Sequence, residues 1–389
     1  MKLPQKRKAL FWLCGGHFVN DVYTGMLNPI MPFVAAKVGI SMAVATIILA
    51  ISHIFSSLMQ PIFGFFADNI VKRSFIFWGL ILSSVFIPLA VTFDRIFLLI
   101  LCIALGSVGS SLFHPQALGL TSKFTEGLDS AKYMSIFLAM GTVGYSLGPV
   151  LSGGITQYIG LNNMPIMSII GIFWVSLMFI LVPKISLIEK IENKLDFKLA
   201  FKEILSNRKL NILNIIAMLK TMIQSSCFIL LPFLWKESGH TPLYIGVALF
   251  MFIFAGGLGS LFSSAVEKIV GSKNVFYISM VSTLPLMVFF VATYDKFSVL
   301  SLVIFVIMGF LSMMATPVTM LMAQNVLPEY KSIISGFING FSWGVIAIVM
   351  SILGFVAENF GITNVLIAVA IIPAVSSVLV KELFKPYNQ

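Results

Sequence analysis

A small set of ionisable and amide side chains lies inside long apolar stretches of this sequence. His17 and Asp21 are four residues apart, so a helix would place both on one face, with Asn20 beside them. The other members of the set are His53, His114, Lys220 and Gln224. In apolar surroundings a carboxylate or an imidazole can hold and release a proton, and an ammonium can pair with an anion. The residue types therefore predict proton transfer or the binding of a charged small molecule.

Asp21 is the first candidate for a proton carrier or substrate contact, with His17 as its partner. Structural alternatives remain open, because an Asp21–His17 or Asp21–Lys220 pair could simply hold helices together. Lys220 could equally bind an anionic substrate or neutralise Asp21. The histidines and the three cysteines show no metal-ligand spacing, so we expect neither a metal nor a cofactor.

The composition indicates how such residues are positioned. Of the 389 residues, 58% are hydrophobic and only 10% are charged, where a soluble protein has about 25% charged residues. A water-soluble globule of this size cannot bury so much apolar surface. The composition excludes a cytosolic enzyme, a secreted disulfide scaffold and a disordered chain, and it predicts an all-α membrane protein embedded in a lipid bilayer.

Twelve stretches are long and apolar enough to span a membrane as helices. They are approximately 9–35, 41–67, 74–93, 96–121, 133–159, 164–183, 210–235, 241–266, 274–294, 297–323, 332–357 and 362–383. With the N-terminus inside, the cytoplasmic segments contain 20 Lys and Arg residues and the outer loops 4. This bias predicts that both termini are cytoplasmic, in a cell inner (plasma) membrane. The net charge of +10 is therefore a topology signal and does not indicate nucleic-acid binding.

The longest polar interval divides the chain into halves of six helices. We predict an N-terminal bundle over 1–183, a cytoplasmic linker over 184–209 and a C-terminal bundle over 210–389. The halves overlay at an offset near 200, with four landmarks in the same order. The matched landmarks are Pro32-Phe33 with Pro232-Phe233, Asp68 with Glu267, His114-Pro115 with Thr316-Pro317, and Gly141, Gly144 and Gly148 with Gly336, Gly340 and Gly344. Two parallel six-helix repeats are the architecture of the major facilitator transporters.

Two further segments resemble signatures of the major facilitator superfamily. The turn GFFADNIVKR contains a Gly, then Asp68, then Lys72 and Arg73. The resemblance implies that these residues, with Glu267 at the repeated position, close the cytoplasmic side as a gate. The second segment, MGTVGYSLGPVLSGG, resembles the fifth-helix signature of members that exchange a drug for protons.

In that segment, small residues recur at four-residue spacing, which lets a neighbouring helix approach closely, and a proline can bend the helix. Packing and hinge motion need the same residues, so both roles stay open. The residues predicted for packing and hinge motion are Gly144, Gly148 and Pro149, with Gly336, Gly340 and Gly344 in the second half.

Several segments together resemble one subfamily, the fosmidomycin-resistance transporters. They are GHFVNDVYTG, SSLMQPIFGFFAD, GSVGSSLFHPQ, MSIFLAMGTVGYSLGP, MAQNVLP and SGFINGFSWG, together with Lys220. The resemblance carries over His17, Asn20, Asp21, Gln60, Asp68, His114, Pro115 and Lys220 as matching positions. It implies a monomer that exports small, often toxic compounds, driven by inward proton flow. The chain departs from the subfamily pattern at Gln116 and Asn325, where Glu is usual, and near Leu138 and Thr142, where Gln and Asn are favoured.

The sequence therefore predicts a secondary active transporter working by alternating access. A proton-coupled antiporter that exports a small organic compound or drug is the first hypothesis, and an uptake symporter or facilitator on the same fold is the alternative. A membrane-embedded enzyme is the remote third, because no nucleophile elbow, HExxH or phosphate loop is present.

Overall fold

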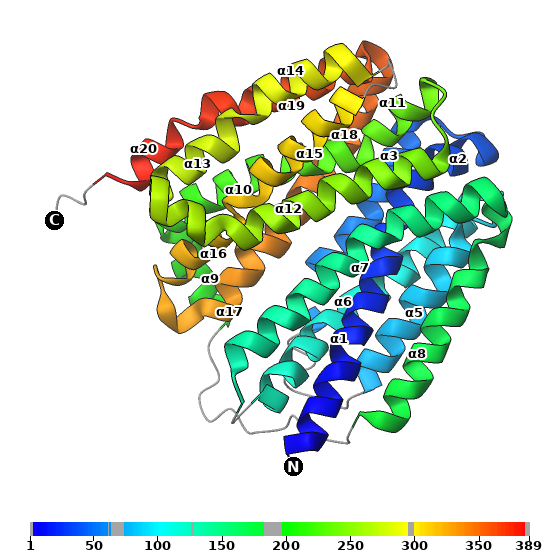
Figure 1. Cartoon of the computed structure of the whole chain (residues 1–389), viewed down its shortest axis with the longest axis horizontal. Helices are drawn as coiled ribbons and strands as arrows, with labels where there is room; N and C mark the ends of the chain where they lie inside the picture. Colours follow the sequence, from blue (N-terminus) through cyan, green and yellow to red (C-terminus); the bar gives the residue numbers. More distant parts are fainter. Residues whose placement is uncertain are drawn as a thin grey trace. The chain divides into compact units, whose positions relative to one another are not determined.

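The computed structural model describes residues 3–60, 62–63, 74–125, 128–182, 197–294 and 299–385. Helices make up the regular structure throughout these ranges (Figure 1). Nine helical segments within them are long and apolar enough to cross a membrane. They are Ile96–Thr125, Lys132–Tyr158, Leu161–Leu181, Arg208–Glu237, Pro242–Val270, Ser272–Thr293, Val299–Gln324, Ile333–Phe360 and Ile362–Leu383. The prediction of an all-helical, multi-pass membrane protein is confirmed.

The three other predicted spans coincide with helices that are shorter or less uniformly apolar. Met42–Leu58 and Ser74–Ala90 are apolar helices of fewer than 18 residues, and the first stretch begins with the basic residues of the N-terminus and contains His17 and Asp21. The count of twelve spans and the cytoplasmic position of the termini stay predictions.

The chain groups into two compact units. The first comprises Met1–Lys190 with Gly239–Phe250, and the second comprises Ile191–Ser238 with Met251–Gln389. Half of the predicted linker, residues 184–196, lies outside the described residues. The predicted domain boundaries, at 183 and 210, stay predictions.

The first unit contains the site residues of the N-terminal half. Its elements are α1 (Leu3–Gly25), α2 (Leu27–Val38), α3 (Met42–His53), the π-helical η1 (Ile54–Leu58), α5 (Ser74–Ala90), α6 (Ile96–Thr125), α7 (Ser130–Tyr158), the 3₁₀-helical η2 (Leu161–Met167) and α8 (Ser168–Leu181). The most extensive packing joins α5 to α6 and α1 to α7 (Figure 1).

Local chemistry sets where several of these helices begin and end. The Ser41 hydroxyl accepts from the backbone N–H of Val44 and caps α3, and the Asp129 carboxylate accepts from that of Lys132 and caps α7. Both are N-cap residues of the preferred kind. Gly39 ends α2 in the left-handed conformation, with φ of 75°.

The crossing of α1 and α7 depends on glycine. A Cβ atom added at Gly144 would lie 2.1 Å from the carbonyl oxygen of Phe18, and one at Gly148 would lie 2.3 Å from that of Val22. No side chain can occupy these positions without separating the helices, because the α1 backbone already fills the space. The small-residue ladder of α7 therefore brings the polar face of α1 directly against the α7 backbone.

The second unit is built in the same way around its first long helix. Its elements are α9 (Phe197–Ser206), α10 (Arg208–Ile229), α11 (Leu231–Glu237), α12 (Pro242–Val270, counted here from Met251), α13 (Ser272–Val281), α14 (Thr283–Thr293), α15 (Val299–Met314), α16 (Thr316–Gln324), η4 (Pro328–Tyr330), α17 (Lys331–Ser335), η5 (Gly336–Phe341), α18 (Ser342–Phe360), α19 (Ile362–Ser376) and α20 (Leu379–Leu383). Apolar side chains from α9, α10, α13 and α16 share one core with those of α20, among them Ile204, Leu213, Phe276, Val318 and Leu383.

Within the described ranges, each unit contains one π-helical segment. In the first unit η1 continues α3, and in the second η5 leads into α18. A π-helical turn holds more residues than an α-helical turn and is found mostly at functional positions of longer helices. Gly336 and Gly340, two of the residues predicted for packing and hinge motion, belong to η5.

Candidate functional site

Helix α1 presents the polar residues of the first unit on one buried face. His17 and Asn20 are buried, with 5% and 0% exposure, although their surroundings are mostly apolar. The side chain of Asp21 is 14% exposed. The i, i+4 spacing of His17 and Asp21 places them one turn apart on this face, as the sequence predicts. Groups of this polarity need hydrogen-bond partners when buried, and the neighbouring helices supply them.

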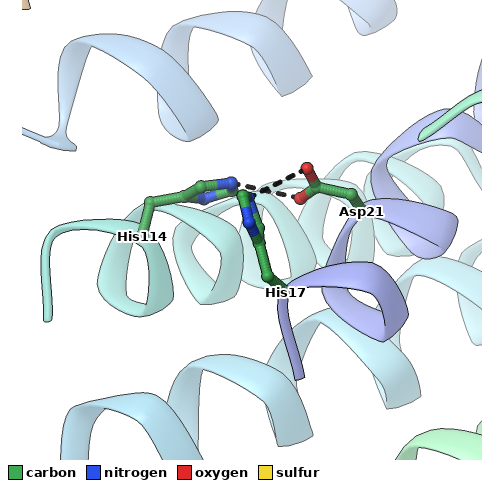
Figure 2. Close-up of side chains that lie close together, drawn as sticks. All are labelled: His17, Asp21 and His114. Atoms are coloured by element: carbon green, nitrogen blue, oxygen red, sulfur yellow. Dashed lines mark ion pairs between the residues drawn. The ribbon is translucent and has the colours of Figure 1, made fainter. Parts of the chain in front are cut away.

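Asp21 lies between two imidazole rings (Figure 2). Its Oδ2 atom is 3.3 Å from Nε2 of His17, on the same helix. Its Oδ1 atom is 3.1 Å from Nε2 of His114, which comes from α6. One carboxylate thus contacts a histidine of its own helix and a histidine of the helix packed against it.

The second nitrogen of each ring faces a backbone carbonyl. Nδ1 of His17 is 2.8 Å from the carbonyl oxygen of Phe137 on α7, and Nδ1 of His114 is 2.8 Å from that of Ser110 on α6. A carbonyl oxygen only accepts hydrogen bonds, and so does an ionised carboxylate. All four ring nitrogens therefore face acceptors, and each of the four contacts needs a proton between its atoms to be a hydrogen bond. Nδ1 of His114 also lies 3.3 Å from the hydroxyl of Ser110, which can donate to it when the ring nitrogen carries no proton.

Asn20 fixes this arrangement from the side. Its amide nitrogen donates to Oδ1 of Asp21 over 3.0 Å and to the hydroxyl of Ser110 over 3.3 Å. Its amide oxygen accepts from the hydroxyl of Ser83 on α5 over 3.0 Å. The side chain of Asn20 therefore links α1 to both α5 and α6 and restricts the carboxylate of Asp21 to one orientation.

Helix α7 covers the other side of the pair. The ring of Phe137 stacks on the imidazole of His17, with centroids 4.2 Å apart and planes 22° from parallel. One turn along, a Cβ atom added at Gly141 would lie 2.3 Å from Cε1 of His17 and 2.8 Å from Oδ2 of Asp21. The backbone at Gly141 is thus in direct contact with the His17–Asp21 pair.

In the second unit, Lys220 on α10 is buried, with 5% exposure. Its ammonium donates to the hydroxyl of Thr316, the first residue of α16, over 3.2 Å. Gln224 lies one turn further along α10 and is also buried. Each half of the chain therefore buries an ionisable side chain of its first long helix.

Comparison with known proteins identifies the family. The sequence profile described as Major Facilitator Superfamily matches residues 13–351, most of the chain. The chain belongs to the major facilitator superfamily. The fosmidomycin resistance protein of Escherichia coli (strain K12) is 24% identical over 99% of this chain and 95% of its own length. The resemblance to the superfamily and to the fosmidomycin-resistance proteins is confirmed.

Other relatives agree with the superfamily membership. An uncharacterised MFS-type transporter, YfnC of Bacillus subtilis (strain 168), is 23% identical over 92% of this chain and 88% of its own length. The putative multidrug resistance protein MdtD of Escherichia fergusonii is 27% identical over 43% of this chain and 37% of its own length. The solved structure of nucleoside transporter NupG covers 97% of this chain and 99% of its own at a TM-score of 0.75 and 16% identity, so it shares the fold.

The remaining candidates are His53 and the residues of the predicted cytoplasmic gate. His53 is half-buried at the last residue of α3, directly before η1. Of the predicted cytoplasmic gate, Asp68, Lys72 and Arg73 lie outside the described residues, whereas Glu267 accepts a hydrogen bond from Ser272 at the start of α13.

The glycines predicted for packing differ between the units. Gly144 and Gly148 on α7 are in close contact with α1, whereas a Cβ atom at Gly336 would meet nothing within 4 Å. Pro149 lies inside α7, and Gly344 is buried in α18. The hinge role of these residues stays a prediction.

The structure adds a function for Gln116 that sequence reasoning missed. Its side-chain oxygen accepts from the backbone N–H of Ile76, in the first turn of α5, over 3.1 Å. Gln116, which departs from the subfamily pattern, therefore provides a hydrogen-bond acceptor for a backbone N–H in the first turn of α5. The sequence contains no local signal for this contact, because 40 residues separate the partners.

The pairing of His114 with Asp21 was also missed, although both were candidates. Nitrogen and oxygen atoms of His17, Asp21 and His114 lie within 4.8 Å of one another, a donor set that could also hold a metal ion. Spacing within one helix does not reveal this group, because its members come from α1 and α6. In the described structure these atoms bond to one another, which favours an interpretation in terms of protons.

Proposed function

We propose that this protein exports a small organic compound in exchange for protons, by alternating access across the plasma membrane. Superfamily membership and the names of two relatives, a fosmidomycin resistance protein and a putative multidrug resistance protein, support export. The proposal includes twelve membrane spans and cytoplasmic termini, and the Lys and Arg bias of the loops supports both.

The observation that carries the proton coupling is the set of acceptors around the two imidazoles. With a proton in all four contacts, two imidazolium rings surround one carboxylate and the group has a net charge of +1. Removal of one proton makes the group neutral and leaves one contact without its hydrogen bond. We propose that the protein loads and releases this proton during each transport cycle.

Proton release would change how α1 is connected to its neighbours. The contact of Asp21 with His114 joins α1 to α6, and the contact of His17 with Phe137 joins α1 to α7. Losing a proton from either contact weakens one of these connections within a buried network, where a hydrogen bond is worth more than in water. Protonation can therefore shift the balance between two conformations of the first unit, as coupling requires.

In this mechanism Asp21 stays ionised and the imidazoles carry the transferable proton. Asn20 holds the carboxylate in place. The gate residues Asp68, Lys72, Arg73 and Glu267 and the packing glycines are proposed to permit opening and closing around a central substrate site. Negatively charged side chains are stabilised near helix N-termini. The carboxylates of Asp68 and Glu267 would close the gate by lying near such termini.

The test is proton flux in sealed vesicles that contain the purified protein and a dye reporting internal pH. A panel of candidate compounds, fosmidomycin included, is added to wild type, Asp21→Asn and His114→Gln. His240→Gln is the matched control, because it removes a buried imidazole that belongs neither to the His17–Asp21–His114 group nor to the predicted site residues. We expect compound-dependent proton flux in wild type and in the control, and its loss in both site variants.

Compound movement without proton flux, unchanged by Asp21→Asn, would overturn the antiport proposal. It would favour the second candidate, a facilitator or uptake carrier on the same fold. One observation supports that candidate: Gln116 has an amide where the subfamily usually has a carboxylate, and an amide has no proton to exchange.

A further inference from the structure

Lys220 is a buried cation with few partners. An ammonium group has three N–H donors, and that of Lys220 donates to the hydroxyl of Thr316. Among the described residues of the second unit, no carboxylate lies within 4.0 Å of its Nζ atom. Burying a charge is costly unless it is paired. The described residues of the second unit therefore supply no counter-charge for this ammonium, and a bound anion would supply one.

The partner of Lys220 lies at the start of a helix. Ala315 separates α15 from α16, and Thr316 is the first residue of the nine-residue α16. Ala315 is the N-cap residue and offers no side-chain acceptor, so no capping hydrogen bond is made. A helix N-terminus has a partial positive charge and favours anions. Two positive features, the ammonium of the buried Lys220 and the start of α16 at the exposed Thr316, therefore meet in the second unit.

The internal repeat relates this point to the proton site of the first unit. Thr316-Pro317 is the counterpart of His114-Pro115, and Lys220 stands one position from the counterpart of Asp21 at an offset of 200. In each unit, the first long helix contacts the residue before a proline in the fourth predicted span of that half. In the first unit Asp21 lies 3.1 Å from His114, and in the second unit Lys220 lies 3.2 Å from Thr316. The first unit has a carboxylate at this place, and the second has an ammonium.

We infer that Lys220 and the N-terminus of α16 bind the anionic group of the transported compound. The chemical class is a small organic anion, such as a carboxylate, phosphate or phosphonate, whose oxygens can accept from the ammonium and from the Thr316 hydroxyl. This inference rests on the proposed function, because it assigns the substrate class of the same transporter. The charge of the ligand would supply the counter-charge that the described residues of the second unit do not provide.

The test measures binding directly and needs no proton gradient. The full-length protein, purified in a neutral detergent without added lipid, is titrated calorimetrically with methylphosphonate and acetate, and with acetamide as the uncharged comparison. The variants are Lys220→Gln, Lys220→Arg and Thr316→Val. Lys209→Gln is the matched control, because Lys209 is an exposed cation on the same helix.

We expect wild type and Lys209→Gln to bind at least one of the anions, with no binding of acetamide. Lys220→Gln should bind it roughly ten- to a hundred-fold more weakly, the loss for one charge-assisted hydrogen bond. Lys220→Arg should retain most of the affinity because it keeps the charge. Thr316→Val should show an intermediate loss.

Absence of anion binding to wild type, or equal affinity in Lys220→Gln and wild type, would overturn the inference. Weaker binding when an anionic phospholipid is added would mean that lipid headgroups compete for the site, and would support the anion chemistry. Failure of the proton-flux test with retained, Lys220-dependent anion binding would reject the antiport proposal and leave the anion site. The two hypotheses therefore fail separately.

Discussion

Substitution of Gly141 by alanine tests whether α7 positions the proton site. Gly141 has no side chain, yet its backbone touches the His17–Asp21 pair. The alanine methyl carbon would lie 2.3 Å from Cε1 of His17, whereas carbon atoms in contact lie about 3.5–4.0 Å apart. The imidazole or the helix must therefore move by roughly 1.2 Å or more to restore an ordinary contact.

A shift of this size breaks a specific hydrogen bond. The His17–Asp21 distance is 3.3 Å, near the upper limit for a hydrogen bond, so it cannot lengthen by an ångström and remain one. A hydrogen bond to a charged group is worth about 1.5–3 kcal/mol. Expressed as a rate, this corresponds to a loss of roughly ten- to a hundred-fold. Overpacking of this kind costs about 1–3 kcal/mol of stability, which leaves most proteins folded.

The assay is compound-dependent proton flux in vesicles, measured together with thermal unfolding of the purified protein. Gly119→Ala is the matched control, because Gly119 is also helical and a Cβ atom there would meet nothing within 4 Å. We expect Gly141→Ala to fold and to lose flux by roughly ten-fold or more, and Gly119→Ala to retain it. Normal flux in Gly141→Ala, or an equal loss in Gly119→Ala, would refute the positioning role of α7.

Two further predictions concern stability and are checked by thermal unfolding in detergent. Gln116→Ala leaves the N–H of Ile76 without its acceptor, and we expect it to cost about 1–3 kcal/mol; Gln116→Glu keeps an oxygen at the N-terminus of α5 and should recover most of the loss, so equal destabilisation by both variants would contradict the capping role. Lys37→Met removes the ammonium that donates to the carbonyl oxygens of Val91 and Thr92 at the end of α5 and to the side chain of Asn162. It should lower the unfolding temperature of the first unit, with an expected cost of about 1–3 kcal/mol, and an unchanged temperature would show that these contacts are not stabilising.

The sequence predicted the helical membrane fold because composition and apolar stretch length depend on the solvent and little on tertiary contacts. It also predicted that His17 and Asp21 share a face, since that follows from helical spacing alone. The contact of Asp21 with His114 and the contact of Gly141 with His17 could not be predicted in this way. Each joins residues more than ninety positions apart, and helix spacing carries no information about which helix packs on which face.

Two candidates show the limits of residue type as a guide. His53 and His114 are both imidazoles in apolar stretches, yet His114 joins the Asp21 group and His53 does not. The difference depends on how α3 and α6 are rotated about their axes. The sequence marks Gln116 only as a departure from the subfamily pattern, and its contact with Ile76 adds a local structural reason for an oxygen acceptor at that position.

The π-helical segment η5 affects how the two halves of the chain can be aligned. A π-helical turn takes up about one residue more than an α-helical turn, so side chains beyond Phe341 are rotated relative to a continuous α-helix. Gly336 and Gly340 lie within this turn and Gly344 lies beyond it, and a Cβ atom at Gly336 would meet nothing within 4 Å. A constant offset between the halves equates residue numbers here while assigning them to different faces. A structure-based alignment of the duplicated bundle needs a one-residue gap at this turn.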